Sequence, residues 1–208
     1  GPQGEALSKR LGTLALRDLR ERGIQPMALL SLMARLGSSD PVEIRSDLSQ
    51  LIDGFDISHF GSAPTKFDAD DLLPLTAHYL QAQPFNAVAE QVAEIGVPAH
   101  LAEPFWDVVK DNITTLNDLE SWWDMLSKGA TPDIDPEDAE FVDTALSMLP
   151  PLPYTPDTWG DWTAAVKDAT GRKGRGLFMP LRKALTGQAH GPDMSQLMPL
   201  LQNPPRRK

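Results

Sequence analysis

The sequence of 208 residues contains no cysteine. This absence excludes disulfide frameworks, zinc ribbons and thiol nucleophiles. The chain also lacks any apolar run close to the ~18 residues that a membrane span requires, and no stretch resembles a secretory signal. We therefore expect a soluble, cytoplasmic protein that does not bind membranes.

Motifs for metal binding and hydrolysis are missing as well. The four histidines (His59, His78, His100 and His190) form no pair spaced three or four residues apart, so sequence gives no metal-ligand pattern. No G-x-S-x-G element is present to anchor a hydrolase triad. We predict no metal site.

Basic residues are scarce in the middle of the chain. The whole sequence has 19 Lys and Arg against 29 Asp and Glu, a net charge of −10. Residues 46–166 hold three lysines and 22 carboxylates, whereas residues 168–208 hold eight basic and two acidic residues. An acidic total is unusual for a nucleic-acid binder, but the basic segment would let a polyanion approach one end. The alternative is an acidic, solvated surface with a basic tail.

Strand signals are few, and apolar residues recur with helical spacing almost throughout. The best β-like stretch, Phe55–Phe60, is short and bounded by glycines. The expected helices cover 11–22, 26–36, 69–82, 84–95, 99–112, 115–127, 137–149, 156–170, 175–186 and 193–201. The predicted fold class is all-α.

Two seams divide this helical pattern, and the length permits one or two domains. Gly61–Lys66 is rich in turn-forming residues, and Pro150–Pro153 contains three prolines, which cannot continue a helix.

Two basic segments carry candidate chemistry. Gly4–Gly12 is a glycine-flanked loop in which Ser8 precedes Lys9, and a lysine on a long stem can follow a polyphosphate. Gly171–Gly187 is a glycine-rich basic loop followed by a predicted amphipathic helix. Arginine offers a planar donor set to phosphates and base edges, and glycines allow close backbone approach. A solvated basic helix start is the structural alternative for this segment.

Three stretches, in order, resemble the carboxy-terminal part of a bacterial glutamyl-tRNA synthetase. Ala6–Arg10, followed by Pro26–Gly37, resembles the KMSKS-type signature loop and the two helices after it. Phe55–Ser58 resembles the segment that leads into the anticodon-binding domain. Gly174–Gly187, with His190–Pro192, resembles the final element of that domain.

The resemblance implies a domain division. Residues 1–75 would hold the signature loop and stem-contact helices, and residues 76–208 a helical anticodon-binding domain in two parts, with a seam near 150–153. The family's nucleotide-binding fold and glutamate pocket are not in this sequence, so we expect no activity from it alone. The parent enzyme would use ATP and L-glutamate to charge tRNA.

Residue by residue, the resemblance assigns an ATP contact. Lys9 matches the second lysine of the signature loop, which is expected to meet ATP phosphates, and Ser8 supports it as a donor. Ala6 replaces the first lysine of the usual pattern.

The resemblance also implies an anticodon site. Arg182 matches an anticodon-contacting arginine, while Gly191, Pro192 and Met194 fall on the loop that packs against anticodon bases. Unpaired bases are read through exposed edges, stacking and apolar contact, so this mixture suits the task.

Asn112 marks a departure from the family pattern. Enzymes of the family that serve only glutamate tRNA tend to have an arginine at this helix end, which tests the third anticodon base. Asparagine offers both a donor and an acceptor, so it need not exclude glutamine tRNA. We therefore expect the parent to accept, or prefer, glutamine tRNA. The alternative is that Asn112 simply ends a helix.

A second class of function remains open, a helical protein–protein interaction module with an acidic surface. Its anchors would be tryptophans, which dominate interface energetics. The candidates are Trp122, Trp123, Trp159 and Trp162, although tryptophans at helical spacing are more often core residues. In either case we expect a monomer.

Overall fold

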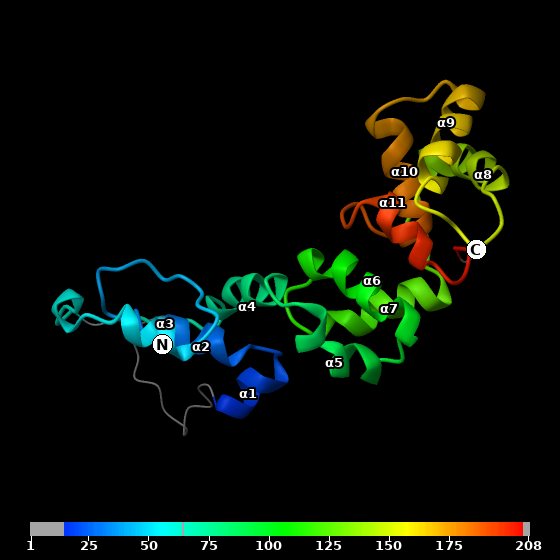
Figure 1. Ribbon diagram of the computed structural model, residues 1–208. Coiled ribbons are helices and arrows are strands. Elements are labelled where there is room, and N and C mark those ends of the chain that lie inside the picture. The colour runs from blue at the N-terminus through cyan, green and yellow to red at the C-terminus, as the bar shows by residue number, and fades with distance from the viewer. Residues whose placement is uncertain (1–14, 64, 206–208) are drawn as a thin grey trace. The chain divides into compact units, whose positions relative to one another are not determined.

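The computed structural model describes residues 15–63 and 65–205. These residues form helices, with a single isolated bridge between Ser38 and Phe60 and no extended strand (Figure 1). The predicted all-α class is confirmed. Ser8 and Lys9 lie outside the described residues.

The chain divides into two compact units. Unit 1 comprises the residues up to Val88 together with Ile113–Asp118, and unit 2 comprises Ala89–Asn112 and the residues from Leu119 onward. The predicted domain boundary at residue 75 and the seam near 150–153 stay predictions.

Unit 1 is built from short helices. They are α1 (Leu16–Glu21), α2 (Pro26–Met33), α3 (Leu48–Asp53), η2 (Ile57–His59), α4 (Leu72–Gln81) and η3 (Phe85–Ala87). Proline starts α2, as expected for a residue that lacks an N–H and has a preset φ. The core of unit 1 is a cluster of buried apolar side chains, namely Leu19, Ile24, Ala28, Leu32, Phe67 and Leu72.

Residues 113–118 pack on the end of α1. Gly23 ends this helix with φ of +78°, and a Cβ built there would lie 2.8 Å from the Cβ of Thr115. Asn117 donates from Nδ2 to the carbonyl oxygen of Glu21 at 3.0 Å. The glycine is therefore required both by backbone conformation and by the close approach of Thr115.

Unit 2 contains most of the longer helices. Its elements are α5 (Ala89–Glu94), α6 (Ala99–Val109), η4 (Lys110–Asn112), α7 (Asp118–Lys128, of which Asp118 belongs to unit 1), η5 (Pro136–Asp138), α8 (Ala139–Ser147), α9 (Thr158–Thr170), α10 (Arg175–Thr186), α11 (Met194–Leu197) and η6 (Met198–Leu200).

Aromatic residues fill much of the core of unit 2. The rings of Phe105 and Trp123 meet edge to face, with centroids 5.8 Å apart. Trp162 is 2% exposed, and its Nε1 donates to the carbonyl oxygen of Ala145 at 2.8 Å. The ring contact joins α6 to α7, and the Trp162 hydrogen bond joins α9 to α8.

Local hydrogen bonds explain two differences from the sequence-based expectations, and a third is a divided helix. Asp47 caps α3, which the periodicity did not predict, by accepting from the backbone N–H of Gln50 at 3.1 Å. The β-like stretch at 55–60 forms η2 instead, because Asp56 accepts from the N–H of Ser58. The single helix expected over 84–95 is divided into η3 and α5.

Candidate functional site

Helix α10 is the centre of the candidate site. It lies between two glycines in the positive-φ region, Gly174 (+56°) and Gly187 (+68°), which set its two ends. One face is buried and carries Leu177, Leu181, Ala184 and Leu185. Arg175, Phe178 and Arg182 follow the i, i+3, i+7 spacing that places side chains on one helix face.

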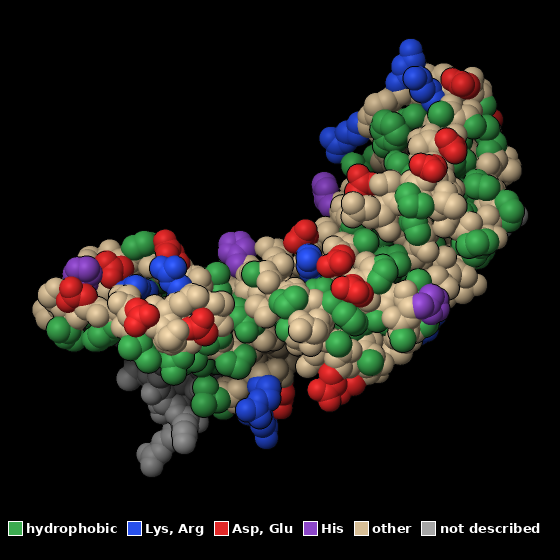
Figure 2. All heavy atoms as spheres, viewed as in Figure 1, with side chains coloured by type: hydrophobic (Ala, Val, Ile, Leu, Met, Phe, Trp, Pro, Cys, Tyr) green, Lys and Arg blue, Asp and Glu red, His purple; other side chains and the backbone are tan. Residues whose placement is uncertain are grey.

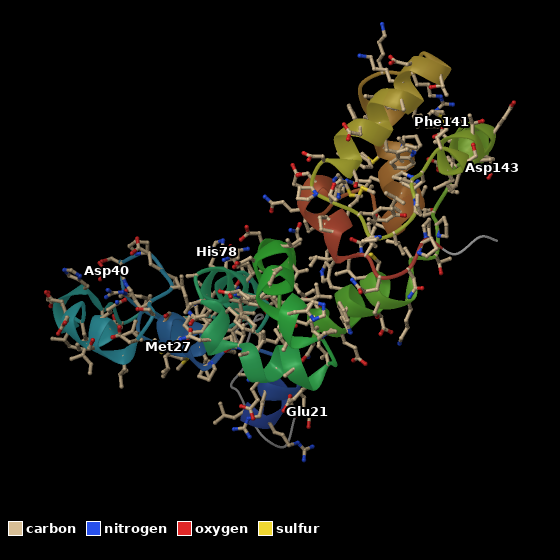
Figure 3. The ribbon with its side chains drawn as sticks, turned by 45° about the vertical axis from the view of Figure 1, so that its right-hand side comes forward. Glu21, Met27, Asp40, His78, Phe141 and Asp143 are labelled. Carbon is tan, nitrogen blue, oxygen red and sulfur yellow. The ribbon has the colours of Figure 1, made fainter. Side chains whose placement is uncertain are left out.

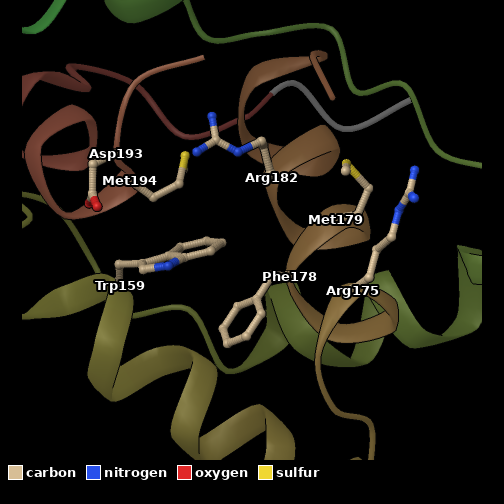
Figure 4. A pocket seen from close by; sticks show the side chains of 7 residues that line it. All are labelled: Trp159, Arg175, Phe178, Met179, Arg182, Asp193 and Met194. Atoms are coloured by element: carbon tan, nitrogen blue, oxygen red, sulfur yellow. The ribbon is translucent and has the colours of Figure 1, made fainter. Parts of the chain in front are cut away.

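A pocket of about 250 Å³ opens beside this face (Figure 4). Its lining comes from α9, α10 and α11 with the residue before it, and consists of Trp159, Arg175, Phe178, Met179, Arg182, Asp193 and Met194. The pocket thus combines aromatic rings, thioethers, two guanidinium groups and one carboxylate.

Two aromatic rings supply the flat surfaces of the pocket. The centroids of Trp159 and Phe178 are 6.2 Å apart with an angle of 38° between the planes. Trp159 also meets Trp162 edge to face at 5.8 Å, which holds its ring from the core side. Phe178 is 45% exposed, so part of its ring is open to a planar ligand.

Arg182 is held by the loop that precedes α11. Its Nη2 donates to the carbonyl oxygen of Pro192 at 2.7 Å. Burial lowers the pKa of the Arg182 guanidinium, and the nearby charge of Asp193 opposes this effect. The Asp193 carboxylate accepts from the Ser195 hydroxyl and N–H, and these bonds, with Arg182, lower its pKa.

The same loop requires a glycine. Gly191 has φ of +146°, and a Cβ there would lie 3.2 Å from Nη1 of Arg182 and 3.2 Å from Cη2 of Trp122. Pro192 and Met194 are buried. The structure therefore brings Arg182, Gly191, Pro192 and Met194 together.

The basic side chains near α10 fall into two groups, one in ion pairs and one exposed. Figure 2 shows Lys and Arg side chains at the surface of this region. Arg172 pairs with Asp138. Lys183 pairs with both Asp133 and Asp135, and each of these two distances is 3.1 Å. Lys173 and Arg175 are exposed and make no ion pair within the part of the chain that the structure describes. Sequence alone did not separate these two groups of cations.

Asn112 stands apart from the pocket lining. It is exposed and ends η4, after α6, and it is not among the seven residues around the pocket. Five lining residues were not predicted as nucleic-acid contacts, namely Trp159, Arg175, Phe178, Met179 and Asp193. The helical spacing from Arg175 to Arg182 could have indicated Phe178, but no local signal marks Trp159.

The tryptophans proposed as interface anchors are mostly internal. Trp122, Trp123 and Trp162 are 7%, 8% and 2% exposed, so they belong to the core. Only Trp159 of the four lines the pocket.

Two further searches cover the described residues. No group of three or more His, Asp or Glu side chains in ranges 15–63 and 65–205 is arranged to hold a metal ion. In the same ranges, every helix is too short or too polar to cross a bilayer.

Comparison with known proteins gives a consistent result. A family model described as an anticodon binding domain matches residues 71–203. Glutamate–tRNA ligase 1 of Cereibacter sphaeroides (strain ATCC 17025) is 68% identical over 202 residues, and glutamate–tRNA ligase 1 of Roseobacter denitrificans is 69% identical over 202 residues. Each match covers 97% of this chain and 46% of the relative, so the chain spans about half of their length.

Solved structures share the fold. A glutamate tRNA ligase from Elizabethkingia meningosepticum superposes with a TM-score of 0.71 at 21% identity, covering 96% of this chain and 46% of that one. Glutamate-tRNA synthetase from Elizabethkingia anophelis gives 0.66 at 21% identity, covering 88% and 39%.

Proposed function

Because the chain belongs to the anticodon-binding-domain family, we propose that unit 2 binds the anticodon loop of a tRNA. The membership, with the high identity to glutamate–tRNA ligases, confirms the family resemblance that the motifs predict. The observation that carries the proposal is the pocket in which Trp159 and Phe178 lie beside Arg175 and Arg182.

The chemistry of the pocket suits an unpaired nucleotide. A base that leaves its stack gains contact with aromatic faces, which the exposed ring of Phe178 and the ring of Trp159 offer. Arg182 is fixed by Pro192 and keeps further N–H donors for a base edge. Lys173 and Arg175 are available for phosphates, because no carboxylate of the described chain neutralises them.

The role of the whole protein follows as a wider proposal. The chain would be the tRNA-binding part of a ligase that joins L-glutamate to tRNA with ATP, acting as a monomer in the cytoplasm. Lys9, supported by Ser8, would contact ATP phosphates in that enzyme. Such a lysine would stabilise charge on the phosphates as glutamate attacks.

Asn112 would decide which tRNA is accepted. Its exposed amide at the end of η4 can donate and accept, so it would tolerate the third anticodon base of glutamine tRNA as well as that of glutamate tRNA. Charging of both tRNAs by the full-length ligase and by its Asn112→Arg form tests this. We expect the arginine to reduce charging of glutamine tRNA selectively, whereas strict glutamate-tRNA specificity before mutation would contradict the assignment.

Anticodon binding itself is tested with a short RNA. The tryptophan fluorescence of the chain is titrated with an anticodon hairpin and with a hairpin of identical stem whose loop bases are removed. We expect saturable binding of the first and at least tenfold weaker binding of the second, since the bases provide the stacking. Equal affinities would reject the pocket as a base site, and no binding would favour the interaction-module alternative.

A further inference from the structure

Arg172 makes three contacts within unit 2. Its Nη1 donates to Oδ1 of Asp138, the last residue of η5. Its guanidinium carbon lies 4.0 Å from the centroid of the Phe141 ring. Phe141 lies on α8 and is labelled in Figure 3. Nη1 also donates to the carbonyl oxygen of Gly176 at 3.3 Å, in the first turn of α10. One side chain therefore joins η5, α8 and α10.

The Gly176 carbonyl is available to Arg172 because of Pro180. In a regular helix the N–H of residue 180 would donate to the carbonyl of residue 176. Pro180 lies inside α10 and has no N–H, so that helical bond is missing. The guanidinium supplies the donor that the helix lacks at this point.

The acidic segment before α8, residues 133–138, also contacts α10 near the C-terminal end of that helix. Lys183 donates to Oδ2 of Asp135, and it pairs with Asp133 at the same distance of 3.1 Å. The Lys183 side chain is only 13% exposed. The charges of Arg172 and Lys183 are therefore paired with this acidic segment. Arg175, on the same helix as Lys183, lines the pocket instead.

We propose that Arg172 is a positioning residue for RNA binding, which clamps the first turn of α10 and so places Arg175 and Phe178 at the pocket without contacting phosphate itself. This inference rests on the proposed function. It reverses the simplest interpretation of a glycine-rich basic loop, in which each cation meets the polyanion. Arg172 is less free than the exposed cations of this loop, because its charge is paired with Asp138. Asp138 and Gly176 engage its Nη1, and Phe141 covers one face of the guanidinium.

Three variants separate positioning from phosphate contact. Arg172→Lys keeps the charge but loses the planar donor set. Asp138→Asn removes a negative charge, which by electrostatics alone would strengthen RNA binding. Arg175→Ala is the matched control that removes an exposed cation from the same loop and helix start. Each is titrated with the anticodon hairpin over a range of salt concentrations.

A positioning role predicts a distinctive pattern. Arg172→Lys and Asp138→Asn should both weaken binding by about tenfold at fixed salt, the scale of a hydrogen bond to a charged group. Neither should change the slope of log affinity against log salt. Arg175→Ala should lower that slope by about 0.7–0.9, the value for one phosphate contact. Tighter binding by Asp138→Asn, or unchanged binding by Arg172→Lys, would overturn the inference.

A second measurement needs no RNA. Amide hydrogen exchange at Leu177–Met179 should be faster in Arg172→Lys than in the unmutated chain, because the first turn of α10 loses its clamp. Unchanged exchange would overturn the clamp. If the unmutated chain binds no hairpin, the proposed function fails, and the exchange result still decides whether Arg172 holds the helix.

Discussion

The guanidinium of Arg182 donates a hydrogen bond of 2.7 Å to the backbone carbonyl of Pro192. This bond ties the middle of α10 to the loop before α11, so the cation at the pocket has a fixed position. A preorganised charge needs no reordering when a ligand arrives, and less entropy is lost on binding. Several consequences of this arrangement can be measured.

Substitutions of Trp159 and Trp162 should have different effects, although the two residues lie only three positions apart on α9. The first should mainly weaken RNA binding, and the second should mainly lower the free energy of unfolding. Replacement of the buried Trp162 by leucine removes its bond to Ala145 and leaves a cavity, so unfolding free energy should fall by about 3–5 kcal/mol. Trp159→Leu should cost less than half of that but weaken hairpin binding by about 1–3 kcal/mol. Urea unfolding and fluorescence titration measure the two effects. If Trp159→Leu lowered stability and left hairpin binding unchanged, the base site would have to lie elsewhere.

Gly191 should not tolerate alanine. The substitution forces an L side chain into a backbone conformation at φ of +146° and towards Arg182 and Trp122, with an expected loss of about 1–3 kcal/mol. The matched control is Gly160→Ala in α9, where a Cβ meets nothing within 4 Å. That change should stabilise the chain by about 0.5–1 kcal/mol, because alanine suits a helix interior better. Thermal unfolding of both variants provides the comparison, and equal melting temperatures would refute it.

His59 should make unit 1 sensitive to pH. Its Nδ1 lies 3.0 Å from Oδ2 of Asp40. This contact, with Asp56, raises the pKa of His59 above 6.5, although Arg35 opposes it. A raised pKa means that protonation favours the folded state. The contribution is complete below the ordinary histidine pKa and is lost as pH rises through the raised value.

An NMR titration of the imidazole checks this expectation. The folded chain should titrate above 6.5, and Asp40→Asn should return the His59 pKa towards that value. A His59 pKa at or below 6.5 in the unmutated chain would show that the carboxylate does not stabilise the charged ring.

The bounds of α10 were predicted more accurately from sequence than the set of cations that are exposed near it. The helix begins at Arg175 and ends at Thr186 as expected, because Gly174 and Gly187 set its ends locally. Local signals cannot pair a residue with a distant one, and Arg172 meets Asp138 only after folding. Sequence alone therefore could not separate the paired cations of this segment from the exposed ones.

The pocket was predictable in part, for the same reason. The family resemblance indicated Arg182, Gly191, Pro192 and Met194, which the structure brings together. Trp159 reaches the pocket through the packing of α9 on α10 and α11, which no spacing within residues 156–170 reveals. The helix α3 was missed although Asp47 and Gln50 form a recognisable cap, since its six residues are too few for periodicity to detect.

The most direct test of the account is a filter-binding titration of the chain against purified glutamate and glutamine tRNAs at two salt concentrations, with Arg182→Ala alongside. We predict saturable binding that weakens steeply as salt rises and falls about tenfold or more in the variant, because Arg182 lies in the pocket. The preferred tRNA would also report on Asn112. Binding that ignores both salt and Arg182 would contradict the claim that this pocket receives an anticodon.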